Sequence, residues 1–497
     1  NFFTSWITGT GTYHEEAIEQ DKLIIVNYLQ NNGYADAQAN IQVSEDSNGK
    51  LNISISVLKG DLFYFGSTEI TGNFLFDAER IKKALLYKDG ENFSPDKLRD
   101  SLERIKDIYG TDGYIETDAT YTLYLDHTSP IYNVKIRIDE SERFKVGLVH
   151  IRGNVSTKKN VILRESKLVP GEFFDIRKLK ITQSRLESLG FFKSVNVYPI
   201  KTTEDLSLGE HYRDIIIEVD ETTTGNLSLF AGFSTIDNIF GGVDIGENNF
   251  DRRGLLSFWK GLSNLRGAGE FAQAKAQIGK KEQSYTLSWM DPYYNDSLWR
   301  FGIDLNYSRS QLQSDDYHVN SLGGSLFGGY PLTSFWSYGW KMRVKNSITH
   351  IDQNIENSEA QTVRQNSGII GGLGNSISYD SVDNIFKPHR GLRTFFDVEI
   401  VGVDRHDNQK EYIPFFKVSY LNTYYYPVWR KGTFKVKCDL KFILPFAETS
   451  PELLPINERY FLGGETTVRG YRPFVLGPHF KTEEGLEQQD PTGGVSS

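Results

Sequence analysis

Apolar and polar residues follow two different periods along the chain, and the change falls near residue 225. Before this point, short apolar strands alternate with segments whose apolar residues recur every three or four positions, which is typical of helices. Leu98, Leu102, Ile105 and Tyr109 form one such stripe. After residue 225 this period is absent, and apolar residues stand at every second position, as in strands. The pattern predicts an α+β first part and an all-β second part.

The first part contains an internal repeat. Segment 65–73 recurs as segment 146–154, and glycines of the first copy recur 81 positions later, as in Gly66 and Gly147. Within each copy, the sequence pattern predicts a strand, a Gly-Asn turn, a helix, a Gly turn, a second helix and two strands, in this order. An upstream copy shows only a helix over 15–32, a turn and a strand over 51–60. Its front strand and first helix are missing, so we expect the given chain to begin inside a domain.

Capping residues mark the second helix of each complete copy. Ser94 can cap the first of these helices, with Pro95 at the first helical position. In the next copy Asp175 is the expected cap and Gly190 the expected end. Strands over 132–140 and 213–221 are predicted to close the two copies. The second of these strands ends just before the second part begins.

The second part predicts long strands with one apolar face. In segment 433–444, for example, Phe434, Val436, Cys438, Leu440 and Phe442 alternate with polar residues. A soluble sandwich alternates as well, so alternation alone does not identify a membrane protein. The strands, however, have about the 9–11 residues that a tilted membrane strand needs. Aromatic clusters also stand at strand ends, as interfacial girdles do: Tyr293-Tyr294, Trp336 with Trp340, and Tyr424-Tyr425-Tyr426 with Trp429. We therefore predict a transmembrane barrel, with Cys438 on its lipid face.

Composition excludes several functions. A formal charge of −10 argues against nucleic acid as a partner, because phosphate contacts need clustered cations. One cysteine excludes an internal disulfide framework and a multi-thiolate metal site. The nine histidines show no metal-binding spacing, and no phosphate-binding glycine loop follows a strand. We expect no enzyme activity, cofactor or metal. No apolar run reaches the roughly 18 residues of a membrane helix, and no signal-peptide pattern opens the chain.

Segment 457–478 carries the sharpest motif, Val468-Arg469-Gly470-Tyr471. It resembles the segment that enters the inward-folded loop of the BamA superfamily of outer-membrane insertases. The resemblance implies that a long loop from about residue 447 returns into the lumen, where Arg469 contacts acidic and aromatic groups of the wall. An arginine fork can hold several acceptors at once, which suits that role. Gly470 would allow a tight turn beside it.

Other segments extend the resemblance over nearly the whole chain. The repeats resemble POTRA domains, and segments 232–254 and 288–296 resemble the first hairpin and a strand end of the family barrel. Segment 378–393 matches a family signature through these residues: Tyr379, Asp380, Asp383, Asn384, Pro388 and Gly391. Its residue types predict a structural turn. A Ca²⁺ or catalytic role for its two aspartates is disfavoured, because no third ligand has suitable spacing. Segment 255–270 is longer than is usual in the family, and we assign it no role.

The expected architecture is three α+β repeats followed by an antiparallel transmembrane β-barrel. Its domains are a partial POTRA-like domain over 1–60, two more over 61–142 and 143–222, and a barrel over 223–497. The resemblance implies sixteen strands when complete, whereas we count about eleven here, so the barrel is expected to be truncated at its C-terminal side. The first strand would form a lateral seam, with these residues: Asn226, Leu227, Ser228, Leu229, Phe230, Ala231, Gly232, Phe233 and Ser234.

The resemblance implies an insertase that folds β-barrel proteins into the outer membrane, with the repeats in the periplasm. Its partners would be unfolded outer-membrane proteins, outer-membrane lipids and accessory lipoproteins on the repeats. The main alternative is a sibling translocation or secretion transporter built from the same parts, although a secretion pore usually has two such repeats and a plugging helix. A passive porin has no use for the repeats. A soluble adhesion protein conflicts with the predicted lipid-facing aromatics.

Overall fold

The computed structural model describes most of the chain. The described residues are 15–45, 51–126, 129–201, 211–234, 238–311, 317–351, 367–384, 387–405, 412–429, 432–446, 449–464, 467–471, 474–481, 487–491 and 493–496. The chain divides into two compact units. Unit 1 holds residues 1–153 and 165–220, and unit 2 holds residues 154–164 and 221–497.

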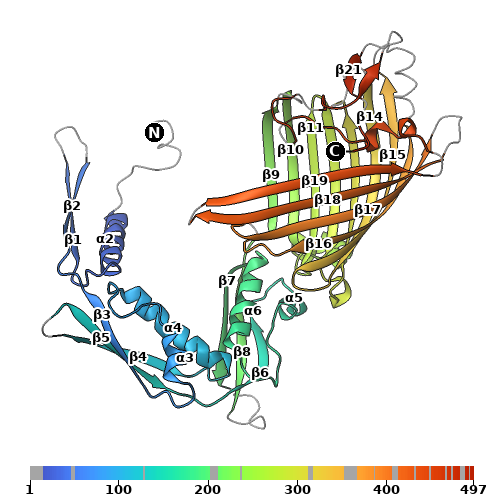
Figure 1. The fold of residues 1–497 in the computed structure, drawn as a ribbon. Coiled ribbons are helices and arrows are strands. Elements are labelled where there is room, and N and C mark those ends of the chain that lie inside the picture. Colours follow the sequence, from blue (N-terminus) through green and yellow to red (C-terminus); the bar gives the residue numbers. More distant parts are fainter. Residues whose placement is uncertain are drawn as a thin grey trace. The chain divides into compact units, whose positions relative to one another are not determined.

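Two complete repeats and one partial repeat follow one another from the N-terminus (Figure 1). The partial repeat contributes α2 (Glu15–Gln30), β1 (Gln38–Glu45) and β2 (Leu51–Leu58). The second repeat contains β3 (Tyr64–Thr71), α3 (Ala78–Lys82), α4 (Pro95–Thr111), β4 (Asp118–Leu125) and β5 (Ile131–Asp139). The third contains β6 (Lys145–Arg152), α5 (Lys159–Leu163), α6 (Ile176–Ser188), β7 (Phe192–Lys201) and β8 (Tyr212–Glu221). The order of elements predicted from the repeat is confirmed.

Each complete repeat forms a three-stranded sheet with its last strand in the centre. The sheet orders are β3-β5-β4 and β6-β8-β7, and the first strand runs parallel to the central one. In the second repeat the predicted stripe of α4 packs on this sheet, with Ile105 and Tyr109 fully buried. The predicted caps are also confirmed. The Ser94 hydroxyl accepts a bond from the backbone of Lys97, and the Asp175 carboxylate accepts one from that of Arg177.

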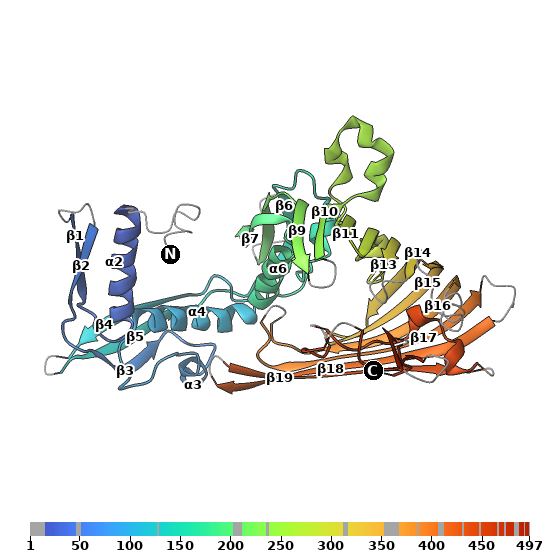
Figure 2. The same ribbon diagram turned by 90° about the horizontal axis from the view of Figure 1, so that it is seen from above.

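The second part folds into one antiparallel sheet of eleven strands in sequence order, which confirms the predicted strand count. The first five strands are β9 (Gly225–Ser234), β10 (Asn238–Phe250), β11 (Glu270–Gly279), β12 (Glu282–Asp291) and β13 (Arg300–Ser310). The other six are β14 (Tyr317–Pro331), β15 (Trp336–Ile351), β16 (Gly368–Asp380), β17 (Gly391–Arg405), β18 (Tyr412–Trp429) and β19 (Gly432–Pro445). The sheet curves into an arc that ends at β9 and at β19 (Figure 2). Within the described residues no pairing of these two strands closes the arc.

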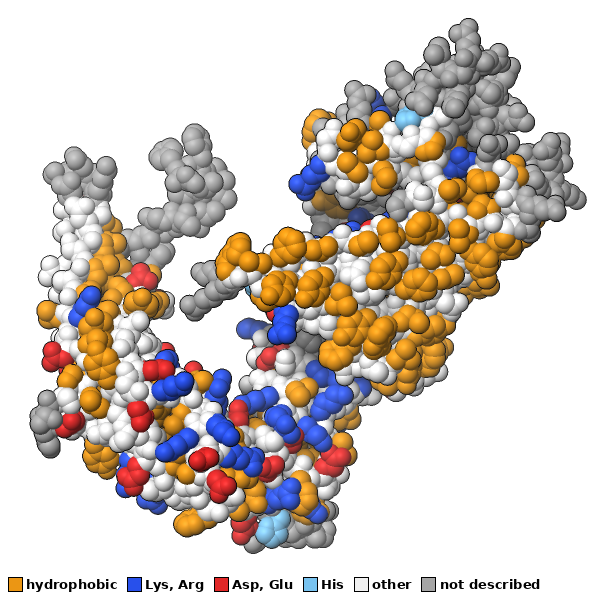
Figure 3. Space-filling view, viewed as in Figure 1, with side chains coloured by type: hydrophobic (Ala, Val, Ile, Leu, Met, Phe, Trp, Pro, Cys, Tyr) orange, Lys and Arg blue, Asp and Glu red, His pale blue; other side chains and the backbone are white. Residues whose placement is uncertain are grey.

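Strand register sorts the side chains of this sheet onto two contrasting faces. One row across five strands reads Leu227, Ile245, Ala274, Leu287 and Leu305. The row next to it reads Ser228, Asp244, Lys275, Thr286 and Asn306. On the strands that face the viewer in Figure 3, β17 to β19, apolar side chains likewise cover the outer surface. A curved sheet with one apolar and one polar face matches the alternation of a transmembrane barrel wall.

After β19 the chain forms a long segment with little regular structure. Short turns at Pro451–Leu453 and Ile456–Glu458 precede a small hairpin of β20 (His479–Lys481) and β21 (Glu487–Pro491). Cys438, which lies on β19, shares the apolar face with Val436 and Leu440, as the alternation predicts. Among the described helices, none has both the length and the apolar character needed to cross a bilayer.

Candidate functional site

The predicted seam strand, β9, lies at one edge of the eleven-stranded sheet. It pairs with β10 over its whole length, from Gly225 opposite Glu247 to Ser234 opposite Asn238. On its other side no described strand is paired with it, so this edge offers free backbone N–H and C=O groups. Its apolar side chains Leu227, Leu229 and Phe233 are all strongly exposed. The strand can therefore accept a further strand without first losing a partner among the described residues.

Two phenylalanine rings join β9 to β10 on the polar face. Phe230 lies opposite Gly242, and Phe240 lies opposite Gly232. A side chain at Gly232 would place its Cβ 2.6 Å from the Phe240 ring, and one at Gly242 would place it 2.4 Å from the Phe230 ring. Each ring thus covers a glycine on the other strand, a cross-strand pairing that fixes register. The hairpin of β9 and β10 (Gly225–Phe250) therefore has a defined register, although the outer edge of β9 is unpaired among the described strands.

The segment after β19 is seated on the polar face of the sheet by its first turns. Leu454 and Ile456 are almost fully buried, Leu454 against residues of β16 to β19 and Ile456 against Tyr317 of β14. The Arg405 guanidinium donates to the carbonyl oxygen of Leu453 at 2.6 Å. The first turns of this segment therefore lie against the polar face, and the return of the whole loop into the lumen stays a prediction.

Glu458 is the charged centre of this contact. Its carboxylate, which is 3% exposed, accepts bonds from Arg343 at 2.8 and 3.0 Å. It also accepts one from Lys345 at 3.1 Å and one from Lys417 at 3.0 Å. Arg343 bonds the Glu399 carboxylate as well. A carboxylate buried this deeply costs free energy unless it is paired and hydrogen-bonded. The loop therefore supplies the anion that a cationic patch on β15 and β18 requires.

The motif residues Val468, Arg469, Gly470 and Tyr471 lie further along the same segment, and all four are exposed. Gly470 has a φ of +94°, which is the left-handed conformation expected for a tight turn. For Arg469, the described part of the chain records no ion pair or hydrogen bond. The wall contact that the resemblance implied for Arg469 stays a prediction.

The predicted turn motif lies between β16 and β17, at the end of the sheet where β9 begins. The Asp383 carboxylate accepts bonds from the backbone N–H groups of His389 and Arg390 at 2.9 and 3.1 Å. These bonds hold the pKa of Asp383 below its usual value. Asp380 bonds Arg393 at 2.9 Å, and Gly391 has a φ of +127°. Both aspartates therefore make hydrogen bonds within this turn. Tyr379, Asn384 and Pro388 lie in the same segment.

Sequence reasoning missed Glu458 as a functional residue. It stands in the segment 457–478 that carries the family resemblance, eleven positions before Arg469. A lone acidic residue in a loop gives no sign that three cations from other strands surround it. The only available signal was the excess of lysine and arginine on the polar face of β15, at Lys341, Arg343 and Lys345.

Comparison with known families assigns both parts of the chain. Residues 5–60, 63–141 and 144–222 each match the POTRA family, described as a surface antigen variable number repeat. Residues 264–497 match the Omp85 superfamily domain. The chain belongs to the BamA/Omp85 family. Members of this family lie in the outer membrane, with their POTRA domains in the periplasm.

Individual relatives agree with this assignment. The chain is 24% identical over 486 residues to the outer membrane protein assembly factor BamA of Nitratidesulfovibrio vulgaris, covering 95% of this chain and 57% of that protein. It is 22% identical over 503 residues to BamA of Neisseria meningitidis, covering 97% of this chain and 59% of that protein. The chain thus spans less than two thirds of the length of these relatives.

A solved structure of the family supports the fold. The crystal structure of BamA from Haemophilus ducreyi lacking POTRA domains 1–3 superposes with a TM-score of 0.64 at 19% identity. The match covers 87% of this chain and 81% of that one. The BamA/Omp85 fold therefore accounts for the α+β repeats followed by a barrel sheet.

Proposed function

We propose that the protein is an insertase that folds and inserts β-barrel proteins into the outer membrane, with β9 as its lateral seam. The observation that carries this proposal is the open edge of β9 in a strand of fixed register. An edge strand binds an incoming strand through backbone hydrogen bonds, which require no particular side-chain sequence. This mode of binding suits a protein that serves many different barrel substrates.

The POTRA repeats are proposed to receive unfolded substrates and accessory lipoproteins in the periplasm. In the second repeat β4 is an edge strand of its sheet. Tyr121, Tyr124 and Leu125 of this strand are about half exposed. An edge strand with exposed aromatic and aliphatic side chains can bind an extended segment by strand addition. The adjoining β5 is central and offers no such edge.

The test follows a substrate strand to the seam. In a Cys438→Ser background, Ser228→Cys places a thiol on β9, and Ser308→Cys places the matched thiol on β13, which is paired on both sides. Both serines lie on the polar face of the sheet. The full-length protein in liposomes is given an unfolded small barrel protein that carries a cysteine in its last strand.

The insertase proposal expects disulfide trapping of the substrate at position 228 and not at 308, together with faster gain of protease resistance than in empty liposomes. Equal trapping at both positions would contradict a role for the β9 edge. Leakage of solutes without accelerated folding would replace the proposal with the sibling translocation or secretion transporter.

A further inference from the structure

Segment 252–266, which connects β10 to β11, has a composition unlike the other connections. It contains four cations (Arg252, Arg253, Lys260 and Arg266) and no acidic residue. Between the cations stand apolar residues, of which Leu255, Leu256 and Trp259 are 52%, 78% and 68% exposed. Cations interleaved with exposed leucine and tryptophan are typical of segments that lie in the interface of a membrane.

The base of this segment is fixed to the strands. The N–H of Asp251 donates to the carbonyl of Leu265 at 2.8 Å, and that of Gly267 donates to the carbonyl of Asn249 at 2.7 Å. At its end, Arg266 bonds Glu247 of β10 at 2.7 Å. The segment is therefore anchored at both ends, beside the start of β9. Its exposed side chains belong to an anchored segment.

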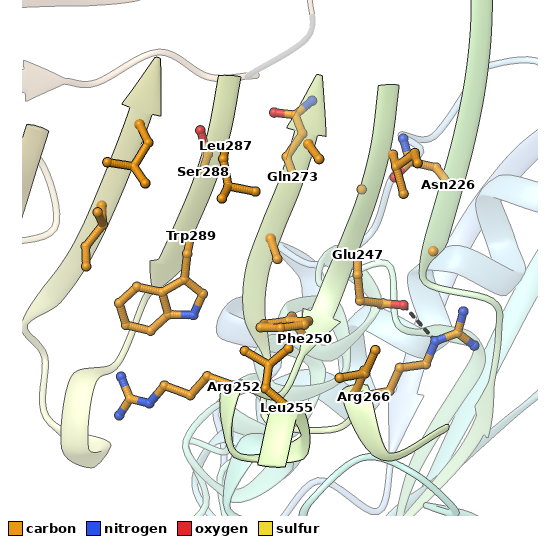
Figure 4. A pocket seen from close by; sticks show the side chains of 18 of the residues that line it. Asn226, Glu247, Phe250, Arg252, Leu255, Arg266, Gln273, Leu287, Ser288 and Trp289 are labelled. Atoms are coloured by element: carbon orange, nitrogen blue, oxygen red, sulfur yellow. Dashed lines mark hydrogen bonds and ion pairs between the residues drawn. The ribbon is translucent and has the colours of Figure 1, made fainter. Parts of the chain in front are cut away.

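The segment covers an apolar cavity of about 1030 Å³ on the outer face of the sheet. Figure 4 shows Leu255 and Phe250 facing this space, with Leu287 and Trp289 of β12 on the opposite wall. Its other lining residues include Leu227 and Ile245, which belong to the apolar row across the sheet. This volume slightly exceeds the roughly 300–1,000 Å³ of ordinary ligand sites. The cavity can therefore hold a long apolar chain.

Two arginines stand at the rim of the cavity, and each is paired with a glutamate: Arg252 with Glu270 at 3.7 Å, and Arg266 with Glu247 at 2.7 Å. The Arg252 guanidinium lies 5.0 Å from the Trp289 ring centroid and 5.2 Å from that of Tyr294. Arg253, the next residue in the sequence, is exposed and lies outside the lining of the cavity, and among the described residues no ion pair involves it. An arginine between an aromatic ring and solvent can bind a phosphate group, because its planar fork matches the phosphate oxygens. An apolar cavity with an arginine rim is complementary to a molecule that has an acyl chain and an anionic head.

We propose that segment 252–266 and the outer face of β9 to β13 form a binding site for one anionic glycerophospholipid. An acyl chain fills the cavity, and the phosphate lies at Arg252 and Arg253. The inference rests on the proposed placement of these strands in the outer membrane. The bound lipid belongs to the leaflet at the end of the sheet where β9 begins, because β10 ends and β11 begins at this end. A lipid held there lies directly beside the seam.

The experiment uses photoactivatable lipids and the full-length protein in phosphatidylcholine vesicles. One probe is a phosphatidylglycerol with a diazirine in its acyl chain, and the other is the matched phosphatidylcholine. The sites of labelling are mapped by mass spectrometry. The proposal expects the phosphatidylglycerol probe to label segment 252–266 and the cavity strands in preference to the phosphatidylcholine probe. Equal labelling by both probes would indicate lipid contact without preference for the anionic head group, and it would overturn the proposal.

Three variants separate the parts of the site. Arg253→Gln removes an exposed cation without breaking a recorded ion pair, and should lower the preference for the anionic probe about fivefold. Ala274→Phe fills the cavity and should abolish labelling of its walls. Val344→Phe is the matched control, because Val344 is exposed on the same face and does not line the cavity. Unchanged labelling of the cavity walls in Ala274→Phe would overturn the proposal.

Substrate folding is measured on the same samples. Selective labelling without insertase activity would support the lipid site and contradict the proposed function. Activity without selective labelling would remove the lipid site alone.

Discussion

Glu458 and Arg343 form a bidentate ion pair although 115 residues separate them in the sequence. The pair joins the segment after β19 to β15, and Lys345 and Lys417 add further bonds to the same carboxylate. Since the carboxylate is 3% exposed, these contacts are shielded from solvent. The start of the inward loop is therefore held by a buried charge cluster.

Removing this charge should release the loop. Glu458→Gln leaves three cations around a neutral amide, and we expect a loss of roughly 3 kcal/mol in the stability of the folded barrel, as for other broken buried ion pairs. The measurement is the temperature at which the heat-modifiable band of the full-length protein unfolds on a gel. Asp439→Asn is the matched control, because its carboxylate also contacts two lysines but is 34% exposed. Equal effects of the two variants would contradict the special role of Glu458.

Arg469 is predicted to have a role distinct from that of Glu458. The family resemblance implies contacts of its guanidinium with the lumen wall, so Arg469→Ala should lower both the unfolding temperature and the assembly activity. Arg469→Lys keeps the charge but loses the planar fork, and we expect it to restore little of the activity. Full activity of Arg469→Ala in the liposome assay would contradict the implied contact.

Because the Phe240 ring covers Gly232, a methyl group added at this position should destabilise the pairing of β9 with β10. The same change at a glycine with free space around it should have little effect. In Gly232→Ala the new Cβ lies 2.6 Å from the Phe240 ring, whereas in Gly371→Ala it meets nothing within 4 Å. We expect Gly232→Ala to weaken the pairing of β9 with β10, and Gly371→Ala to be tolerated. Hydrogen exchange of the amides of residues 225–234 measures this. Protection that is unchanged in Gly232→Ala would show that the ring moves aside without cost.

The contact between the second and third repeats should become less stable at low pH. Arg213 bonds Glu116 at 2.6 Å, and this bond lowers the pKa of Glu116 against the opposing effect of burial. A depressed pKa in the folded state stabilises the junction above the unfolded value of about 4.3, and this stabilisation is lost as the pH falls through the folded value. Distances between spin labels on the two repeats should therefore broaden below about pH 4.

Glu116→Gln should show the broad distribution already at neutral pH. Glu103→Gln is the control, since within the described ranges the ion pair of Glu103 is with Lys106 of its own helix, at 3.9 Å. A distribution that is narrow at neutral pH in Glu116→Gln would assign the junction to its other contacts, such as Lys180 with Asp107 at 2.6 Å.

The sequence by itself determined the elements of this protein and their order. Caps such as Ser94 and Asp175 act within three residues of their own position, and the alternation along β19 is a property of one strand. Such local rules can be read from a single segment. They predicted the repeats, the eleven strands and the apolar face that carries Cys438.

Only the tertiary structure decided which distant residues meet. Glu458 finds Arg343 and Lys417 because the sheet curves and its polar face receives the loop, and no local pattern records that encounter. Likewise, the role proposed for segment 252–266 depends on the apolar cavity that this segment covers on the outer face. The physical reason is that burial and charge pairing depend on distances between strands, whereas the sequence records only distances along the chain.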